Sequence, residues 1–109
     1  MNPGDKPLVW LHGEVKTPPF GSSARIEVGF LLRRLQRGEQ LSMPHARPMA
    51  QIGTQCFELR ITDAGISWRL VYRIDADAIV IAEVFSKKSA RTPAEVLSRC
   101  RRLMEYDNA

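Results

Sequence analysis

The chain has little of what marks secreted, membrane-spanning or metal-binding proteins. It contains only two cysteines, Cys56 and Cys100, and they form no CxxC pair. Residues 1–5 lack a positively charged stretch followed by an apolar run. The apolar run at residues 29–32 is followed at once by two arginines, far short of the roughly 20 residues of a membrane span. We therefore expect a cytoplasmic protein with two buried free thiols, no metal site and no cofactor.

The composition shows an excess of positive charge. Sixteen Lys and Arg residues stand against twelve Asp and Glu residues, so the formal net charge is +4. Nine of those sixteen fall between Arg60 and Arg102, and clustered basic residues favour a polyanionic partner. A chain of this length buries about 65% of the surface of its unfolded form, enough for one modest core. We expect a single domain over residues 1–109, with a flexible tail at residues 1–6.

Three strands are predicted where side chains alternate with a period of two. They span residues 56–62, 68–74 and 78–85. The alternation places Arg60, Arg69 and Arg73 together on one exposed sheet face, and the third strand runs into Lys87 and Lys88. Cations gathered on a rigid sheet can bind phosphates, so this surface points toward RNA.

Two helices are predicted from apolar spacing and from cap residues. Apolar residues at i, i+3, i+4 and i+7 predict a helix over residues 24–36, with Ser22 or Ser23 as its N-cap. Gly38 is suited to the position just beyond its end. Residues 92–95 read as a capping box, with Thr92 as N-cap and a proline at the first helical position, and they begin the second helix.

The predicted order is therefore strand, helix, loop, three-stranded meander, helix. The first strand covers residues 8–11, and the loop holds a short edge strand near residues 47–50. Residues 79–82 are all apolar, so the last meander strand should lie inside the sheet with both faces covered. The expected fold class is α+β, a small sandwich in which a mostly antiparallel sheet has its helices packed on one side.

Four segments, taken in order, resemble a known family. They are Pro7–Phe20, Phe57–Ile61, Trp68–Arg73 and Val84–Lys88, the last followed by Thr92 and Pro93. Together they resemble the phage-derived HigB-like toxins of the RelE/ParE superfamily, over about Pro7 to Tyr106. The resemblance implies a RelE-like sandwich and the toxin of a type II toxin–antitoxin pair. Such a toxin enters the ribosomal A site and cleaves mRNA there, and a cognate helix-turn-helix antitoxin is its partner.

The resemblance also implies which residues hold the RNA. Arg69 matches the family's arginine at the scissile phosphate, and Lys87 and Lys88 match the cationic position after the last strand. The candidates for RNA binding on the same surface are Arg60, Arg73 and Arg91. A planar guanidinium can hold two phosphate oxygens at once.

Attack of a ribose 2′-hydroxyl on the adjacent phosphate needs no metal, but it needs a cation, a base and an acid. Members of the family carry tyrosine or histidine near the C-terminus for this purpose. Here Tyr106 stands only at the end of the last helix, and no histidine follows His45. The candidates for acid and base are therefore Glu58, Lys87 and His45.

Two other functions and one simpler explanation stay open. Superfamily members with this fold include inhibitors of DNA gyrase, and a phage-derived binding protein could keep the fold without the chemistry, because fold alone does not determine function. The three arginines of the sheet face could also simply form ion pairs with Glu58 and Glu83 on a solvated surface.

Overall fold

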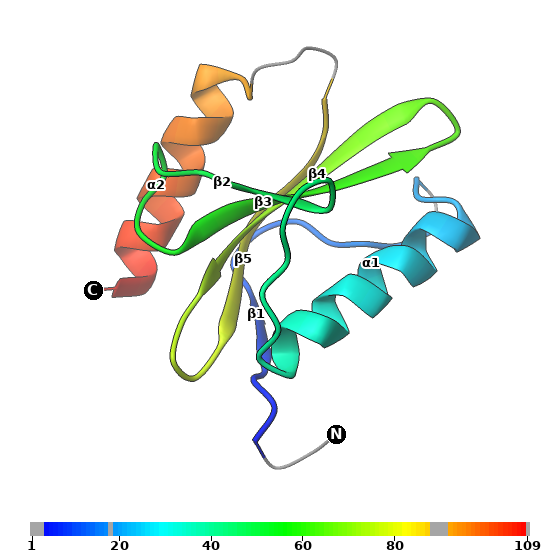
Figure 1. Ribbon diagram of the computed structural model, residues 1–109. Coiled ribbons are helices and arrows are strands. Elements are labelled where there is room, and N and C mark those ends of the chain that lie inside the picture. The colour runs from blue at the N-terminus through cyan, green and yellow to red at the C-terminus, as the bar shows by residue number, and fades with distance from the viewer. Residues whose placement is uncertain (1–3, 18, 88–91, 109) are drawn as a thin grey trace.

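The elements follow the predicted order in the computed structural model, which describes residues 4–17, 19–87 and 92–108 (Figure 1). The strands of these residues are β1 (Leu8–Trp10), β2 (Ala46–Pro48), β3 (Cys56–Asp63), β4 (Ile66–Ile74) and β5 (Ile79–Lys87). The helices are α1 (Ser22–Gln36) and α2 (Ala94–Asn108). Neither of these helices has the length and apolar character that crossing a membrane requires.

The described strands form one sheet in the order β1-β5-β4-β3-β2. β1 runs parallel to β5, whereas all other neighbouring strands are antiparallel. A two-residue turn joins β3 to β4, and its residues Ala64 and Gly65 have φ angles of 49° and 81°, as a type I′ hairpin turn requires. The predicted edge strand is β2, and β5 lies inside the sheet. The expected α+β class with a mostly antiparallel sheet is confirmed.

The two helices cover opposite faces of the sheet, so the expectation that both pack on one side is wrong (Figure 1). The core under α1 includes Val28, Leu35, Leu59, Leu70 and Ile79. The core under α2 includes Cys56, Val71, Val80, Val96, Cys100 and Met104. β5 is apolar on both faces, and Val71 interrupts the arginine face of β4. Each face therefore has apolar area that only a helix on its own side can cover.

The start of α1 is held by the hairpin rather than by a serine cap. Its N-cap is Gly21, whose N–H donates a 2.7 Å hydrogen bond to the Asp63 carboxylate at the end of β3. Ser22 and Ser23 lie inside the helix, and no side chain caps it, so the predicted serine cap is wrong. The negative charge of Asp63 also suits the positive end of the helix dipole.

The end of α1 confirms the role predicted for Gly38. This glycine has a φ of 93°, in the left-handed region. Its N–H donates to the carbonyl of Leu35, and the N–H of Glu39 donates to the carbonyl of Arg34. These two bonds form a Schellman motif, which satisfies the last carbonyls of the helix.

The start of α2 differs from the prediction by one residue. The helix begins at Ala94, so Pro93 precedes it, and the Pro93 carbonyl accepts hydrogen bonds from Val96 and Leu97. Thr92 lies outside the helix, and its hydroxyl donates to a side chain of the sheet instead of acting as the cap. The side of α2 that carries Val96, Cys100 and Met104 packs on the sheet.

Candidate functional site

A buried carboxylate near the middle of the sheet organises the candidate site. Glu58 lies in β3 and is 0% exposed. One carboxylate oxygen lies 3.2 Å from Arg47 Nη2, 3.2 Å from Arg69 Nε and 3.6 Å from Lys87 Nζ. The other oxygen accepts a 2.7 Å hydrogen bond from the Thr92 hydroxyl. We call these five residues the Glu58 cluster.

Strand register explains why segments so far apart in the chain meet here. Arg47 stands directly opposite Glu58 in the β2–β3 pair. In the β3–β4 pair Glu58 stands opposite Val71, so Arg69 lies diagonally across on the same face, two residues along β4. Thr92, which lies just before α2, also reaches this face of the sheet. The cluster therefore depends on four strands and on the approach to α2.

The Glu58 cluster contains two more cations than anions. Burial lowers the pKa of Lys87 from its ordinary value; Glu58 opposes this effect, and the charges of Arg47 and Arg69 reinforce it. Burial also lowers the pKa of Arg69, although an arginine stays protonated at physiological pH. A second anion at this place would therefore relieve repulsion among partly buried cations.

Two guanidinium groups of the cluster have unused donors. Arg69 Nη1 donates a 3.0 Å hydrogen bond to the carbonyl of Trp68. Arg69 Nε is close enough to Glu58 to form an ion pair, yet neither it nor Arg47 Nε has a hydrogen-bond partner among the described residues. A buried N–H without an acceptor is unfavourable by about 1–3 kcal/mol. Because both Nε atoms are buried, an anion reaches the two arginines through their terminal nitrogens or after the side chains move.

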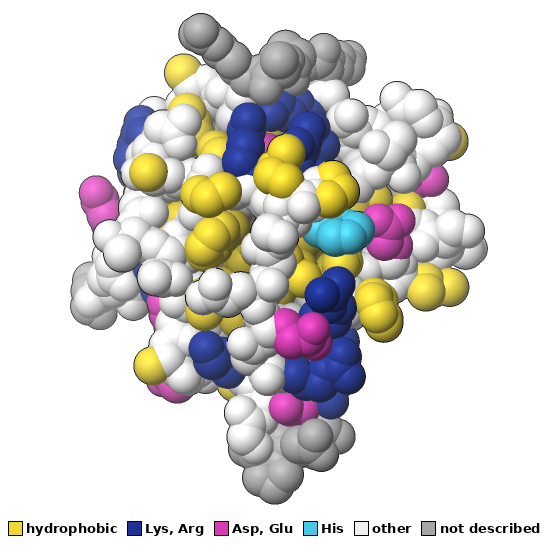
Figure 2. All heavy atoms as spheres, in the orientation of Figure 1, with side chains coloured by type: hydrophobic (Ala, Val, Ile, Leu, Met, Phe, Trp, Pro, Cys, Tyr) yellow, Lys and Arg dark blue, Asp and Glu magenta, His cyan; other side chains and the backbone are white. Residues whose placement is uncertain are grey.

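Arg69 also lines a cavity of about 410 Å³. The other lining residues are Glu27, Pro44, His45, Arg60, Thr62 and Ser67. Arg60 stands directly opposite Arg69 in the β3–β4 pair and forms no ion pair with any described residue. Figure 2 shows Lys and Arg side chains gathered near the top of this view and again at its lower right, with hydrophobic side chains between the two groups. The cavity thus offers two guanidinium groups, an imidazole and hydroxyls to a ligand.

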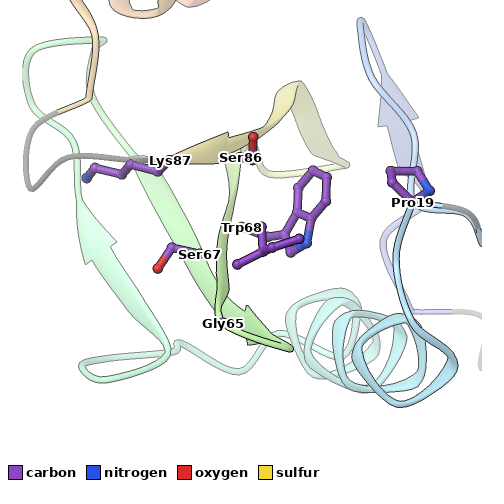
Figure 3. A pocket seen from close by; sticks show the side chains of 7 residues that line it. Pro19, Gly65, Ser67, Trp68, Ser86 and Lys87 are labelled. Carbon is purple, nitrogen blue, oxygen red and sulfur yellow. The ribbon is translucent and has the colours of Figure 1, made fainter.

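A second cavity, of about 680 Å³, lies beside the first, and Ser67 lines both. Trp68, Ile66 and Pro19 give it apolar walls. Figure 3 shows the Trp68 indole on the side of Pro19, whereas Lys87 points away from it toward the other side of β4. The indole also stacks on Phe20, with ring centroids 4.2 Å apart. Cationic and apolar surfaces therefore adjoin at this end of the sheet.

Arg73 is not part of this site, although it shares a sheet face with Arg69. Its guanidinium forms ion pairs with Asp75 and with Asp107 of α2, and it donates to the carbonyl of Met104. These bonds fix the last turn of α2 to the hairpin between β4 and β5. The Arg73 guanidinium therefore stabilises the fold, and its partners leave few of its N–H groups for a ligand.

The arginine face is less exposed than the alternation predicts. Arg69 and Arg73 are each only 8% exposed, because α2 and the Glu58 cluster cover much of that face. The ion-pair explanation holds for Arg69, which pairs with Glu58, but Glu83 instead pairs with His12 and with Arg99 of α2.

The structure brings some of the predicted residues together and reveals others. Arg69, Lys87 and Glu58 meet in one cluster, with Arg60 and His45 at the adjoining cavity; Lys88 and Arg91 lie outside the described residues. Sequence reasoning missed Arg47 and gave Thr92 a different role. The sequence signal that could have identified Arg47 is its place in the predicted edge strand. In the structure that strand pairs with the strand that carries Glu58.

No three His, Cys, Asp or Glu side chains of residues 4–17, 19–87 and 92–108 come together as a metal would require. In a comparison with known protein families, residues 20–105 match the family described as "Phage derived protein Gp49-like (DUF891)". No curated protein and no solved structure matches the chain.

Proposed function

The chain belongs to the phage-derived Gp49-like family, and from this premise we propose that it is the toxin of a type II toxin–antitoxin pair. Membership in the family is consistent with a toxin-like role. We further propose that it is a HigB-like member of the RelE/ParE superfamily and cleaves mRNA in the ribosomal A site, in the cytoplasm. The observation that carries this proposal is the surplus of cations around Glu58, next to a cavity lined by Arg60 and Arg69.

The phosphate to be cleaved would lie between Arg69 and Arg60. As the ribose 2′-oxygen attacks phosphorus, negative charge grows on the phosphate oxygens, and fixed guanidinium donors stabilise that charge. Arg69 forms an ion pair with Glu58 and donates a hydrogen bond to the Trp68 carbonyl, so its guanidinium group is oriented before the substrate arrives. Arg47 can hold a neighbouring phosphate of the strand.

We assign the proton transfers to one residue of the Glu58 cluster and one residue of the adjoining cavity. Lys87 has a pKa lowered by burial, which makes its ammonium group a better acid for the leaving 5′-oxygen. His45 lines the cavity with Arg69 and is the candidate base that takes the 2′-hydroxyl proton. The 2′-oxygen–phosphorus bond forms while the bond from phosphorus to the 5′-oxygen breaks. The products are a 2′,3′-cyclic phosphate and a 5′-hydroxyl.

Glu58 fits a positioning role better than a catalytic one. Its carboxylate is wholly buried, and each oxygen already has a partner within the Glu58 cluster. It would orient Arg69 and Lys87 and keep their charges close together. Such a role needs no contact between Glu58 and the RNA.

The test is primer extension on an mRNA that purified ribosomes are translating. We expect new 5′ ends inside the reading frame when the protein is added, and none on the same mRNA without ribosomes. A parallel assay of DNA gyrase supercoiling should show no inhibition. Intact mRNA on translating ribosomes, together with inhibited gyrase, would overturn the proposal in favour of a gyrase poison.

A further inference from the structure

The outer surface of α1 carries apolar side chains where a solvated helix normally carries polar ones. Ile26 is 68% exposed and Phe30 is 60% exposed, and they lie one helical turn apart. Gly29 lies between them, and a Cβ built there would meet nothing within 4 Å. The buried stripe of the same helix already supplies its packing onto the sheet. These two side chains are therefore not needed for the core.

Two arginines continue the same line along the helix. The positions of Ile26, Phe30, Arg33 and Arg37 are spaced by four, three and four residues, which is the spacing of a coiled-coil seam. We call these four residues the α1 seam. Its first half is apolar, and its second half is cationic.

The cationic half is only partly neutralised within the protein. Arg33 forms an ion pair with Asp5, and Arg37 shares Glu39 with Arg34. Arg25, on the flank of the seam, forms no ion pair with any described residue. A partner that covers the seam would need apolar side chains at one end and carboxylates at the other.

We propose that the α1 seam is a docking surface for an acidic amphipathic helix of a partner protein. Apolar residues of that helix would pack on Ile26 and Phe30, and its carboxylates would pair with Arg33 and Arg37. A helix is the fitting shape because a seam with coiled-coil spacing accepts side chains from another helix. None of the four seam residues lines either cavity of the candidate site, so the inference does not depend on the proposed mRNA cleavage.

The charge of the α1 seam and the small size of its apolar half favour an acidic helix over a second copy of the chain or a membrane surface. A second copy of the chain would bring a second basic α1 against the first, and like charges repel. An anionic membrane surface attracts basic helices, but stable binding there needs a broad apolar face, and two apolar side chains provide little. The combination of a short apolar contact and a cationic end fits an acidic helix best.

The probe is a fluorescein-labelled synthetic helix of about three heptads, with leucine along one stripe and glutamate beside it. Fluorescence anisotropy measures its binding to the full-length protein. The control peptide has the same composition with its leucines spread around the helix. We expect the amphipathic peptide to bind and the control peptide to bind at least about tenfold more weakly, the loss typical of a well-placed apolar anchor.

Protein variants then locate the surface. Phe30→Ser and the double change Arg33→Glu with Arg37→Glu should each weaken binding by about tenfold or more. Matched controls are Tyr106→Ser, which removes another exposed side chain with a large apolar part, and Arg102→Glu on α2; both should bind as the wild type does. Circular dichroism checks that each variant is folded.

Several results would overturn the proposal. One is the absence of peptide binding, and another is equal binding of both peptides or of all variants. Co-sedimentation with phosphatidylglycerol vesicles that is lost in Phe30→Ser, without peptide binding, would assign the seam to membranes. A dimer in size-exclusion chromatography that Phe30→Ser converts to a monomer would assign it to a second copy of the chain.

Discussion

At the scale of single residues, the Glu58 cluster depends more on its one carboxylate than on any one of its three cations. The carboxylate stabilises three cations that repel one another, whereas each cation is one of several partners of the carboxylate. Removing one cation leaves Glu58 satisfied by the others and by Thr92. Removing Glu58 leaves every cation of the cluster without its main partner. Function and stability should therefore separate between the two kinds of substitution.

The first prediction concerns Arg69→Ala. We expect it to lower the rate of ribosome-dependent mRNA cleavage by about 10²–10³, because one preorganised donor to the phosphate is lost. Arg69→Lys should restore only part of the rate, since lysine lacks the planar fork. Quantitative primer extension measures the rate, with Arg102→Ala as an exposed control. A folded Arg69→Ala protein that cleaves at the wild-type rate would remove this residue from the mechanism.

The second prediction concerns Glu58→Gln. We expect the free energy of unfolding to fall by about 3–5 kcal/mol, because breaking a buried ion-pair network leaves uncompensated charge. Urea denaturation followed by circular dichroism measures this quantity. The control is Glu105→Gln on the exposed side of α2, where a change of no more than about 0.5 kcal/mol is expected. Equal stability of the two variants would show that the Glu58 cluster contributes nothing to folding.

At the scale of elements, α2 is attached to the sheet at both of its ends. Near its start, the Thr92 hydroxyl donates to Glu58 on β3. At its last turn, Arg73 of β4 pairs with Asp107 and donates to the carbonyl of Met104. Between these points, the apolar stripe of the helix packs on the sheet. Each attachment can be removed without touching the other.

The third prediction tests the attachment of the last turn of α2 to Arg73. Arg73→Gln should increase hydrogen exchange in the last turn of α2, because the ion pair with Asp107 is lost. RNA binding measured by filter retention should stay within about twofold of the wild type, whereas Arg60→Gln should weaken it about tenfold, typical of losing one charge-assisted contact. If the two variants weaken RNA binding equally, Arg73 belongs to the RNA surface after all.

The elements were largely predictable, whereas their contacts were not. Alternation located β3, β4 and β5 and placed Arg60 and Arg69 on one face, because side-chain direction follows directly from strand geometry. It could not show which face α2 would cover, since that depends on apolar area summed over several strands. The role of Thr92 was missed for a related reason: a capping motif is local, whereas its bond to Glu58 joins residues 34 positions apart.

At the scale of the whole molecule, two buried thiols make stability depend on pH. Burial raises the pKa of Cys100 to about 12 and also raises the pKa of Cys56. In the unfolded chain both thiols ionise near their ordinary pKa of 9.0. Between these values the unfolded state releases a proton that the folded state retains. The free energy of unfolding therefore falls as pH rises above about 9.

The fourth prediction follows from this linkage. Each thiol should contribute a slope of up to about 1.4 kcal/mol per pH unit above pH ~9. Cys100→Ala should make the pH dependence shallower, although it also lowers stability at every pH by leaving a small void. Urea denaturation between about pH 7.5 and pH 10.5 measures both effects, and the comparison uses slopes rather than absolute values. An unchanged slope in Cys100→Ala would contradict the prediction.

The Glu58 cluster draws on residues from position 47 to position 92 of a chain of 109 residues. A growing polypeptide still attached to the ribosome that makes it lacks the complete Glu58 cluster until Lys87 and Thr92 have been added. If the protein attacks translation as proposed, this order of synthesis is a safeguard. The ribosome that makes the proposed toxin would complete the Glu58 cluster only once residue 92 has been added, and products truncated before that residue would lack the complete cluster.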